Sequence, residues 1–266
     1  MQKPTFMKNA ISWHKDSHMI EKLHLIGEEP LSIRIQGKAY SVIMRTPGEE
    51  IEHAAGFCLA EGIADSPDDI ESISFCNDAN TNVVAVMLKK SRRDIISSIM
   101  DRRGFISQTS CGICGKELAE DLFQKIQPVA SKTCINKTKA MECLEALSSK
   151  QPLRQQTRAA HAAAVYNPDF TLISIAEDVG RHNALDKAIG KLFLKNRLSE
   201  ISFLILSSRI SYELVQKAAR ARIPVIISIS RPTSLAVELA MKLHIGLACF
   251  APNNGLYIFD SHHRFE

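Results

Sequence analysis

The sequence predicts an α/β protein made of a small α+β unit followed by a larger α/β domain. Two observations lead to this fold class. The second half alternates short apolar segments with amphipathic ones, which is typical of a largely parallel sheet covered by helices on both faces. The first half instead has a hairpin pattern, one helix and two further strands. We expect the boundary near residue 130, which gives domains 1–130 and 131–266.

The N-terminal unit is expected to begin with a loosely held arm, because the first twenty or so residues look polar and unpatterned. Residues 29–45 then alternate apolar and polar side chains on either side of Gln36-Gly37, and this pattern predicts a β-hairpin. Its apolar positions on the return strand are Tyr40, Val42 and Met44.

A helix is predicted next, over residues 46–63. Thr46 is its expected cap, Pro47 suits its first turn, and Gly62 closes it. Residues 69–89 follow as two strands around an Asn/Asp turn. Together these elements make up the small α+β unit.

The C-terminal domain is predicted from regular alternation of strands and helices. The alanine-rich stretch around His161 is expected to be helical. The strands are predicted at residues 171–178, 201–209, 224–230 and 245–251. The amphipathic helices between them are predicted at residues 182–196, 211–223 and 233–244.

Composition excludes several classes of protein. The net charge of +4, with no basic run, is too small for a nucleic-acid-binding footprint. The N-terminus lacks the apolar core of a signal peptide, and the most apolar strand is too short to cross a bilayer. We therefore expect a cytoplasmic protein without membrane or nucleic-acid partners. Seven cysteines, an odd number scattered along the chain, indicate reduced thiols rather than a disulfide framework.

A ligand site is expected where the predicted strands end, because open α/β sheets bind ligands beyond the carboxyl ends of their strands. Three arginines, several hydroxyls and helix N-termini at that edge suit a phosphate-bearing ligand. Ordinary helix capping by Ser, Thr and Asp remains the simpler alternative. The candidate residues are Glu177, Asp178, Arg181, His182, Ser208, Arg209, Arg231, Phe250, Ala251, Pro252, Asn253, Asn254 and Gly255.

The motif TSCGICGK carries the second candidate site, at Cys111 and Cys114. The spacing alone is a weak signal, because roughly 0.2 such pairs are expected by chance from seven cysteines. Its surroundings strengthen it: glycines keep the loop adaptable, and a helix-forming run begins immediately afterwards. A thiol at a helix N-terminus beside Lys116 has a lowered pKa and is more reactive.

Three other uses of a CxxC motif compete with a reactive thiol. Structural zinc needs four ligands, but the remaining cysteines do not form a second pair. A zinc deaminase needs H-x-E, and Ala163 stands where the glutamate would follow His161. A thioredoxin-like couple would need a buried strand before Cys111, which the sequence does not show.

Several motifs together closely resemble the formate dehydrogenase accessory sulfurtransferase (FdhD) family. They are TPGEEIEHAAGFCLAEGI, TSCGICGK, TRAAHAAAV, EDVGRHNALDKAIG, SSRISYELVQKAARARIPVI and RPTSLAVELA, in this order. The resemblance runs from about residue 30 to the end. The approach to His161 is poorer in glycine than in relatives, and FAPNNG lacks a basic residue that is frequent there.

The resemblance implies a sulfurtransferase that carries sulfur from a cysteine desulfurase to the molybdenum (or tungsten) bis(molybdopterin guanine dinucleotide) cofactor, required for formate dehydrogenase activity. It implies that Cys111 carries the persulfide with Cys114 as its partner, and that Phe250 to Gly255 bind the cofactor, for which GDP is a partial mimic. From the residues themselves, His161 is expected to be a structural or second-shell group. Glu177, Asp178, Arg181 and His182 either contact the ligand or form a buried polar network at the domain or dimer interface, as possible second-shell residues. The resemblance also implies a homodimer, a C-terminal three-layer α/β/α domain resembling the cytidine deaminase fold, and no permanently bound metal. A non-catalytic cofactor-binding chaperone with a redox-sensing CxxC is the alternative.

Overall fold

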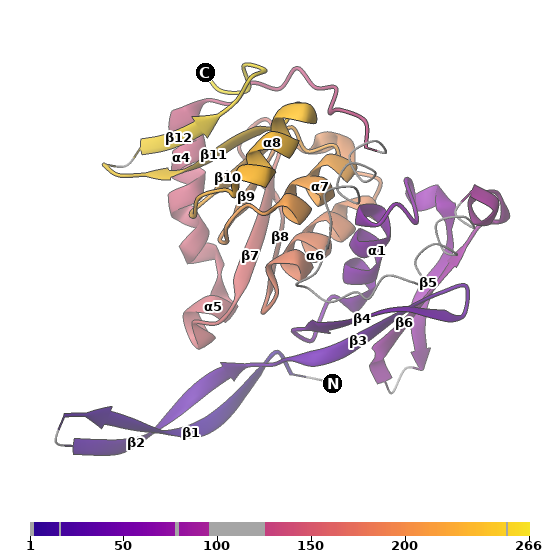
Figure 1. Ribbon diagram of the computed structural model, residues 1–266. Coiled ribbons are helices and arrows are strands. Elements are labelled where there is room, and N and C mark those ends of the chain that lie inside the picture. Colours follow the sequence, from indigo (N-terminus) through magenta and orange to yellow (C-terminus); the bar gives the residue numbers. More distant parts are fainter. Residues whose placement is uncertain (1–2, 16, 78–79, 96–125, 254) are drawn as a thin grey trace.

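The computed structural model describes residues 3–15, 17–77, 80–95, 126–253 and 255–266. Within these residues it contains a two-stranded ribbon, a four-stranded sheet and a six-stranded sheet, with helices packed on the two larger sheets (Figure 1). Cys111 and Cys114 lie outside the described residues. No helix in the described part of the chain is long and apolar enough to span a membrane.

The N-terminal arm is a β-ribbon, so the expectation of an unpatterned segment is wrong. Strands β1 (Thr5–His14) and β2 (Ser17–Ile26) pair antiparallel along their whole length and project from the body (Figure 1). The alternation was hidden because apolar side chains such as Phe6 and Ile11 occur on both faces of the ribbon.

The four-stranded sheet confirms the predicted hairpin and the two strands after the helix. Its order is β4-β3-β6-β5. Positive φ angles at Gln36 and Gly37 close the turn of the hairpin. The bounds are β3 Glu29–Ile35, β4 Lys38–Arg45, β5 Ile70–Asn77 and β6 Asn80–Leu88.

Strand β4 presents a different face from the one predicted. A register shift between Ile33 and Arg34 leaves Ile43 packed against the core, while Val42 and Met44 are exposed. A β-bulge of this kind reverses the side-chain alternation beyond it.

Helix α1 (Glu50–Ala60) begins later than predicted. Its N-cap is Glu49, whereas the Thr46 hydroxyl accepts a hydrogen bond from Val179 N at 3.0 Å. The predicted end is confirmed at Gly62, which has a φ of 71°. A 3₁₀ turn follows at Pro67–Asp69.

The six-stranded sheet has the order β12-β11-β10-β9-β7-β8. Strands β9, β10 and β11 are parallel, but β7 and β12 run against their neighbours, so the sheet is mixed rather than largely parallel. Strand β12 was not predicted. The bounds are β7 His161–Tyr166, β8 Leu172–Asp178, β9 Phe203–Leu206, β10 Val225–Ser228, β11 Gly246–Ala251 and β12 Gly255–Phe259.

The alanine-rich stretch at His161 is strand β7, so the expectation of a helix there is wrong. Alanine favours helices intrinsically, but this propensity is readily overridden by tertiary packing. Here Ala162 and Ala164 face one side of the sheet and Ala163 faces the other, all buried under helices. Small side chains on both faces of a central strand allow those helices to approach closely.

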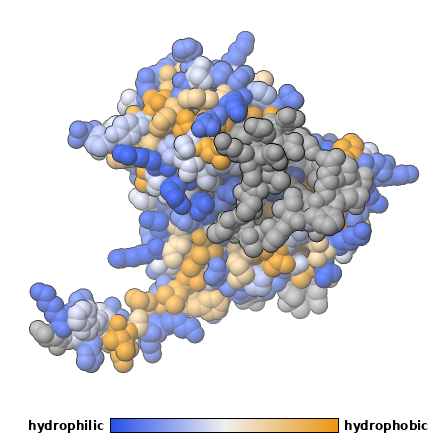
Figure 2. Space-filling model, viewed as in Figure 1, coloured by the Kyte–Doolittle hydropathy of each residue, from blue (hydrophilic) through white to orange (hydrophobic). Residues whose placement is uncertain are grey.

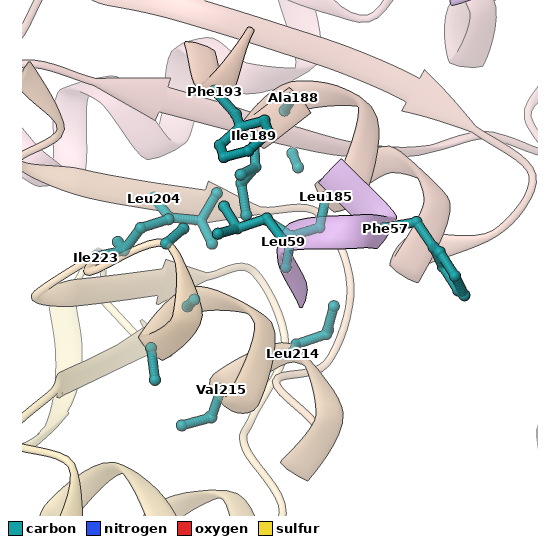
Figure 3. Packing of buried hydrophobic residues seen from close by; sticks show 14 of the residues in the cluster. Phe57, Leu59, Leu185, Ala188, Ile189, Phe193, Leu204, Leu214, Val215 and Ile223 are labelled. Atoms are coloured by element: carbon teal, nitrogen blue, oxygen red, sulfur yellow. The ribbon is translucent and has the colours of Figure 1, made fainter. Parts of the chain in front are cut away.

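Helices cover both faces of the large sheet, and the three helices predicted over residues 182–244 are confirmed. On one face α4 and the turn after it close a core cluster that includes Phe203 and Ile227. On the other face a larger cluster includes Leu185, Leu204 and Leu214 (Figure 3). The helices are α4 Lys137–Glu145, α5 Pro152–Thr157, α6 Arg181–Phe193, α7 Tyr212–Arg220 and α8 Ser234–Lys242, with 3₁₀ turns at Ala146–Lys150 and Leu198–Glu200.

The larger core cluster also runs into the N-terminal unit, where it includes Ile33 and Leu59. Helix α1 packs directly against α6, and both helices need glycine at the contact. A Cβ on Gly56 would lie 1.9 Å from Asp186 O, and one on Gly190 would lie 1.8 Å from Glu52 O. The division into domains 1–130 and 131–266 stays a prediction.

Candidate functional site at the edge of the large sheet

The sheet topology gathers the predicted site residues along one edge. Strands β8, β9, β10 and β11 all end there, and β7 begins there because it runs the opposite way. His161 therefore lies opposite Asp178 in the ladder, although the two are far apart along the chain. From β8 to β11 the edge extends about 19 Å, at about 4.8 Å per strand. An extended ligand with several phosphates can span this distance.

Asp178 serves structure rather than ligand contact. Its side chain is fully buried and accepts hydrogen bonds from Thr46 N, Gly180 N and Asn183 Nδ2 at 2.9–3.0 Å. The ammonium group of Lys187 lies 2.6 Å from Asp178 Oδ2 and donates to Thr46 O at 2.7 Å. This network ties the loop after β4 to the start of α6 and so fixes one end of the edge.

Glu177 also has a local structural partner. Its two carboxylate oxygens accept from Leu153 N at 2.8 Å and from Arg154 N at 2.9 Å, at the first turn of α5. A carboxylate at this position satisfies amides that have no partner within the helix. Glu177 thereby holds Arg154 near His161.

Four cationic or ionisable side chains form what we call the rim cluster: Arg154, His161, Arg181 and His182. Burial lowers the pKa of His161, and nearby Arg181, Arg154 and His182 lower it further. The imidazole is therefore neutral at pH 7, with one nitrogen available to donate and one to accept. The cluster concentrates positive charge where β7 begins and α6 starts.

The rim cluster has buried polar atoms that need a partner. His161 Nδ1 and Arg181 Nε make no hydrogen bond to any described residue. His182 Nε2 lies 3.0 Å from Glu213 Oε2, and the imidazole holds the pKa of that carboxyl below its usual range. Buried donors without partners are costly, so their gathering at one place favours an anionic or carbonyl-rich ligand.

The opposite end of the edge is the β11–β12 hairpin. Ala251 pairs with Gly255, Asn253 has a φ of 58°, and Pro252 and Asn253 are exposed at the tip. Phe250 is half-buried and packs on the smaller core cluster, so it supports the hairpin. Asn254 lies outside the described residues.

Arg231 lies beside this hairpin. Its guanidinium carbon is 5.5 Å from the ring centroid of Tyr257, the residue that pairs with Cys249. Arg209, after β9, is exposed between the two ends, whereas Ser208 is buried and donates to Arg209 O at 3.1 Å. Of the predicted residues at this part of the edge, Arg209, Arg231, Pro252 and Asn253 are exposed.

Sequence reasoning missed the buried charges that support the edge. Lys187, and the pair of Asp186 with Lys217 at 2.7 Å, lie between α1, α6 and α7. A detectable signal was present: Lys187 lies four residues after Asn183 on the helix face that also carries buried apolar side chains. A lysine on such a face indicates a buried partner.

The cysteines outside the TSCGICGK motif differ in exposure. Cys58 and Cys249 are buried and Cys143 is half-buried, but Cys76 and Cys134 are exposed. Burial raises the pKa of Cys58 far above that of a free thiol, which makes it unreactive. In the described part of the chain, no three His, Cys, Asp or Glu side chains are grouped to hold a metal ion.

The fold and this edge define an α/β protein with a mixed sheet and cationic side chains along one of its edges. Residues 26–266 match the FdhD/NarQ family, and the chain belongs to this family. It is 37% identical over 248 residues to a sulfur carrier protein FdhD of Mycolicibacterium paratuberculosis, covering 88% of this chain and 89% of the relative. It is 36% identical over 261 residues to that of Sulfolobus acidocaldarius, covering 97% and 98%.

A solved structure shares the fold. It is described as a formate dehydrogenase accessory protein from Desulfotalea psychrophila, and it superposes with a TM-score of 0.78 at 22% identity. The match covers 98% of this chain and 99% of the other. The mixed α/β architecture, including the arm-bearing N-terminal half, therefore has a solved counterpart.

Proposed function

We propose that this protein is a sulfur carrier that serves formate dehydrogenase, as the names of its relatives indicate for those proteins. The observation that carries the proposal is the rim cluster, in which Arg181 Nε and His161 Nδ1 have no partner among the described residues, in a family member that also has the TSCGICGK motif. The cluster suits an anionic substrate, and the motif suits a reactive thiol. Together they describe a protein that brings sulfur to a bound anionic molecule.

The proposed chemistry at Cys111 is persulfide transfer. The Cys111 thiolate attacks the terminal sulfur of a persulfide on a cysteine desulfurase. The donor's S–S bond breaks, the donor cysteine leaves as a thiolate, and a new S–S bond forms at Cys111, with no net oxidation. On transfer to the substrate the S–S bond at Cys111 breaks, Cys111 leaves as a thiolate, and the acceptor supplies the electron pair for its new bond to sulfur. Alternatively Cys114, separated from Cys111 by two residues in the motif, attacks the sulfur of Cys111, releases the terminal sulfur as sulfide and forms a disulfide.

The proposed acceptor is the molybdenum (or tungsten) bis(molybdopterin guanine dinucleotide) cofactor, bound as substrate. Its phosphates would meet Arg181 and the rim cluster at one end of the edge. Arg231, Arg209 and the hairpin of residues 251–253 would receive a guanine-bearing arm at the other end. Charge-assisted hydrogen bonds from guanidinium groups to phosphates are among the strongest that a protein makes. GDP should therefore bind as a partial mimic.

The proposed partners follow from this chemistry. A cysteine desulfurase supplies sulfur, formate dehydrogenase receives the modified cofactor, and both steps take place in the cytoplasm. We propose a homodimer as the functional unit. A cofactor-binding chaperone whose two cysteines only sense redox state is the second candidate, since the exposed edge alone would serve either role.

Mass spectrometry after incubation with a cysteine desulfurase and cysteine tests the proposal. We expect a gain of one sulfur on the peptide containing Cys111, abolished in Cys111→Ala and retained in Cys76→Ser, whose thiol is also exposed but lies outside the motif. Replacement of Cys114 should reduce activity less than replacement of Cys111. Sulfur found on no cysteine, or full formate dehydrogenase activity in cells with only Cys111→Ala, would favour the chaperone instead.

A further inference from the structure

The arm formed by β1 and β2 exposes apolar side chains to an unusual extent. Three of them form one cluster near its tip, on the same face of the ribbon: Ile11 is 73% exposed, Trp13 is 72% exposed and Ile20 is 76% exposed. Ile11 lies directly opposite Ile20 in the ladder. The other face adds Phe6, Met19, Leu23 and Leu25, all more than 40% exposed. Both faces of the ribbon therefore need to be covered.

A free ribbon of this kind is not a stable structure in water. Two isolated strands are marginal without a third strand or a packed face, and long apolar strands with open edges promote aggregation. Within the described residues neither β1 nor β2 pairs with a third strand. The arm is about 33 Å long at about 3.4 Å per residue, so its tip lies far from its own body.

The base of the arm fixes its direction. Gly27 N donates to Pro4 O at 2.7 Å, and a Cβ on Gly27 would lie 2.6 Å from Lys3 O, so the crossing at the base is tight. Gln156 Nε2 of α5 lies 3.1 Å from His24 Nδ1 and supports β2 from the side. The arm is thus held pointing away from the body, as Figure 1 shows, rather than folded back on it.

A second uncovered apolar surface adjoins the base of the arm. It is the outer face of the four-stranded sheet, on the side opposite α1. Val42 and Met44 of β4 are 67% and 50% exposed there. Ser32 of β3 lies between Val42 and Val83 of β6 on the same face, because it pairs with Val42 in one ladder and with Val83 in the next. Figure 2 shows hydrophobic residues along the arm and on the part of the body next to its base.

We propose that the arm docks on a second copy of this chain, with its tip on the outer face of the partner's four-stranded sheet. One chain carries both surfaces, so a two-fold axis lets each copy give its arm and receive the other, which is how an isologous interface is built. One face of the arm carries Met7, Ile11, Trp13 and Ile20, each able to bury on the order of 100 Å². Each copy would bury this face of its own arm and also the sheet surface that receives the other arm, so the two contacts together reach about the 800 Å² per partner of a standard interface. This inference rests on the proposed homodimer and assigns its surface.

The arm lies almost wholly before residue 26, where the family match begins. Trp13, the single tryptophan of the sequence, lies in the tip cluster. Tryptophan buried at the centre of an interface commonly dominates its binding energy. Its fluorescence also reports directly on whether the tip is covered.

The test compares oligomeric state and Trp13 emission in the full chain. We expect a dimer by sedimentation, with blue-shifted emission poorly quenched by acrylamide, and a red shift on dilution into the monomer range. Trp13→Glu and Val42→Glu should each give monomers. Met241→Glu, at a comparably exposed apolar residue of α8, should remain a dimer.

Mixing the two monomeric variants separates arm-to-sheet docking from other contacts. One intact contact remains possible, between the arm of Val42→Glu and the sheet of Trp13→Glu, so the mixture should regain dimer and the blue-shifted emission of its only tryptophan. A dimer in Trp13→Glu would show that the arm does not form the interface, while the proposed homodimer itself would be retained. Monomeric Trp13→Glu with dimeric Val42→Glu would show that the arm does not dock on the outer face of the four-stranded sheet. A wild-type monomer with exposed Trp13 would overturn both assignments, whatever the sulfur-loading result at Cys111.

Discussion

Lys187 Nζ lies 2.6 Å from Asp178 Oδ2, and both side chains are almost completely buried where the loop after β4 meets helix α6. Around this pair, Thr46 contributes its amide to the carboxylate and its carbonyl oxygen to the ammonium group. The pair therefore joins the N-terminal unit to the sheet edge on which the proposed substrate binds.

Removing either charge of the Asp178–Lys187 pair should lower the free energy of unfolding. Asp178→Asn leaves a buried ammonium group without its counter-charge, so the free energy of unfolding should fall by about 3–5 kcal/mol. The double variant Asp178→Asn/Lys187→Met should lose less than the sum of the two single losses. Urea unfolding followed by circular dichroism measures this.

A matched control is Glu200→Gln, whose partner Arg197 lies 2.6 Å away on the exposed surface. Solvent screens that pair, and stability should hardly change. Strict additivity of the two buried substitutions would show that Asp178 and Lys187 do not act as a pair.

Gly56→Ala should separate α1 from α6. The added methyl group would meet the backbone of Asp186, which cannot rotate away, and overpacking of this kind costs about 1–3 kcal/mol or more. Gly255→Ala meets nothing closer than 3.5 Å and should leave the melting temperature nearly unchanged. Equal melting temperatures for the two variants would contradict the close helix contact.

Stability should fall in mild acid because of His53. The ring is completely buried, its two nitrogens make no hydrogen bond to described residues, and burial lowers its pKa well below 6.5, helped by Lys187, Lys217 and Arg45. Below about pH 6.5 the unfolded chain takes up a proton that the folded chain refuses, so stability decreases by up to about 1.4 kcal/mol per pH unit. Above that range His53 contributes no pH dependence.

His53→Leu tests this sign. Its stability relative to the wild type should rise as the pH is lowered from about 7.5 to 5, measured by urea unfolding at each pH. His263→Asn, at an exposed position near the C-terminus, should track the wild type throughout. A constant difference between His53→Leu and the wild type across this range would mean that folding leaves the pKa of His53 unchanged.

GDP should bind in the micromolar range or weaker, and ADP less well if the base is recognised. Arg181→Ala and Arg231→Ala should each weaken GDP, because a charge-assisted contact to phosphate is worth about 1.5–3 kcal/mol. Neither change should alter sulfur loading at Cys111. Calorimetric titration at low salt measures the affinities.

Arg197→Ala serves as the control, since this arginine is paired with Glu200 away from the edge. If Arg197→Ala weakens GDP as much as Arg231→Ala does, general charge rather than the edge explains the binding. Absence of binding for both nucleotides would remove the edge from the proposed function.

The sequence predicted the helices of the large domain because their apolar faces repeat with helical period, as in α6. It failed at β7, where three consecutive alanines indicate a helix by their intrinsic propensity. They lie in a strand, where their small side chains fit under the helices packed on both faces of the sheet. It failed at β4 because a bulge reverses the alternation, and bulges leave no clear local pattern. It predicted Asp178 and Glu177 as possible second-shell residues, but it could not predict their partners, Thr46 and the first turn of α5, because these lie far away along the chain.

The glycine contact between α1 and α6, together with the buried ion pair beside it, determines whether the two halves of the chain can fold separately. Helix α6 would expose Lys187, Asp186 and a strip of leucines if the N-terminal unit were removed. The two halves should therefore melt in a single cooperative transition, and a truncated C-terminal half should aggregate rather than fold. The sheet edge that we propose binds the substrate should therefore not fold as an independent module.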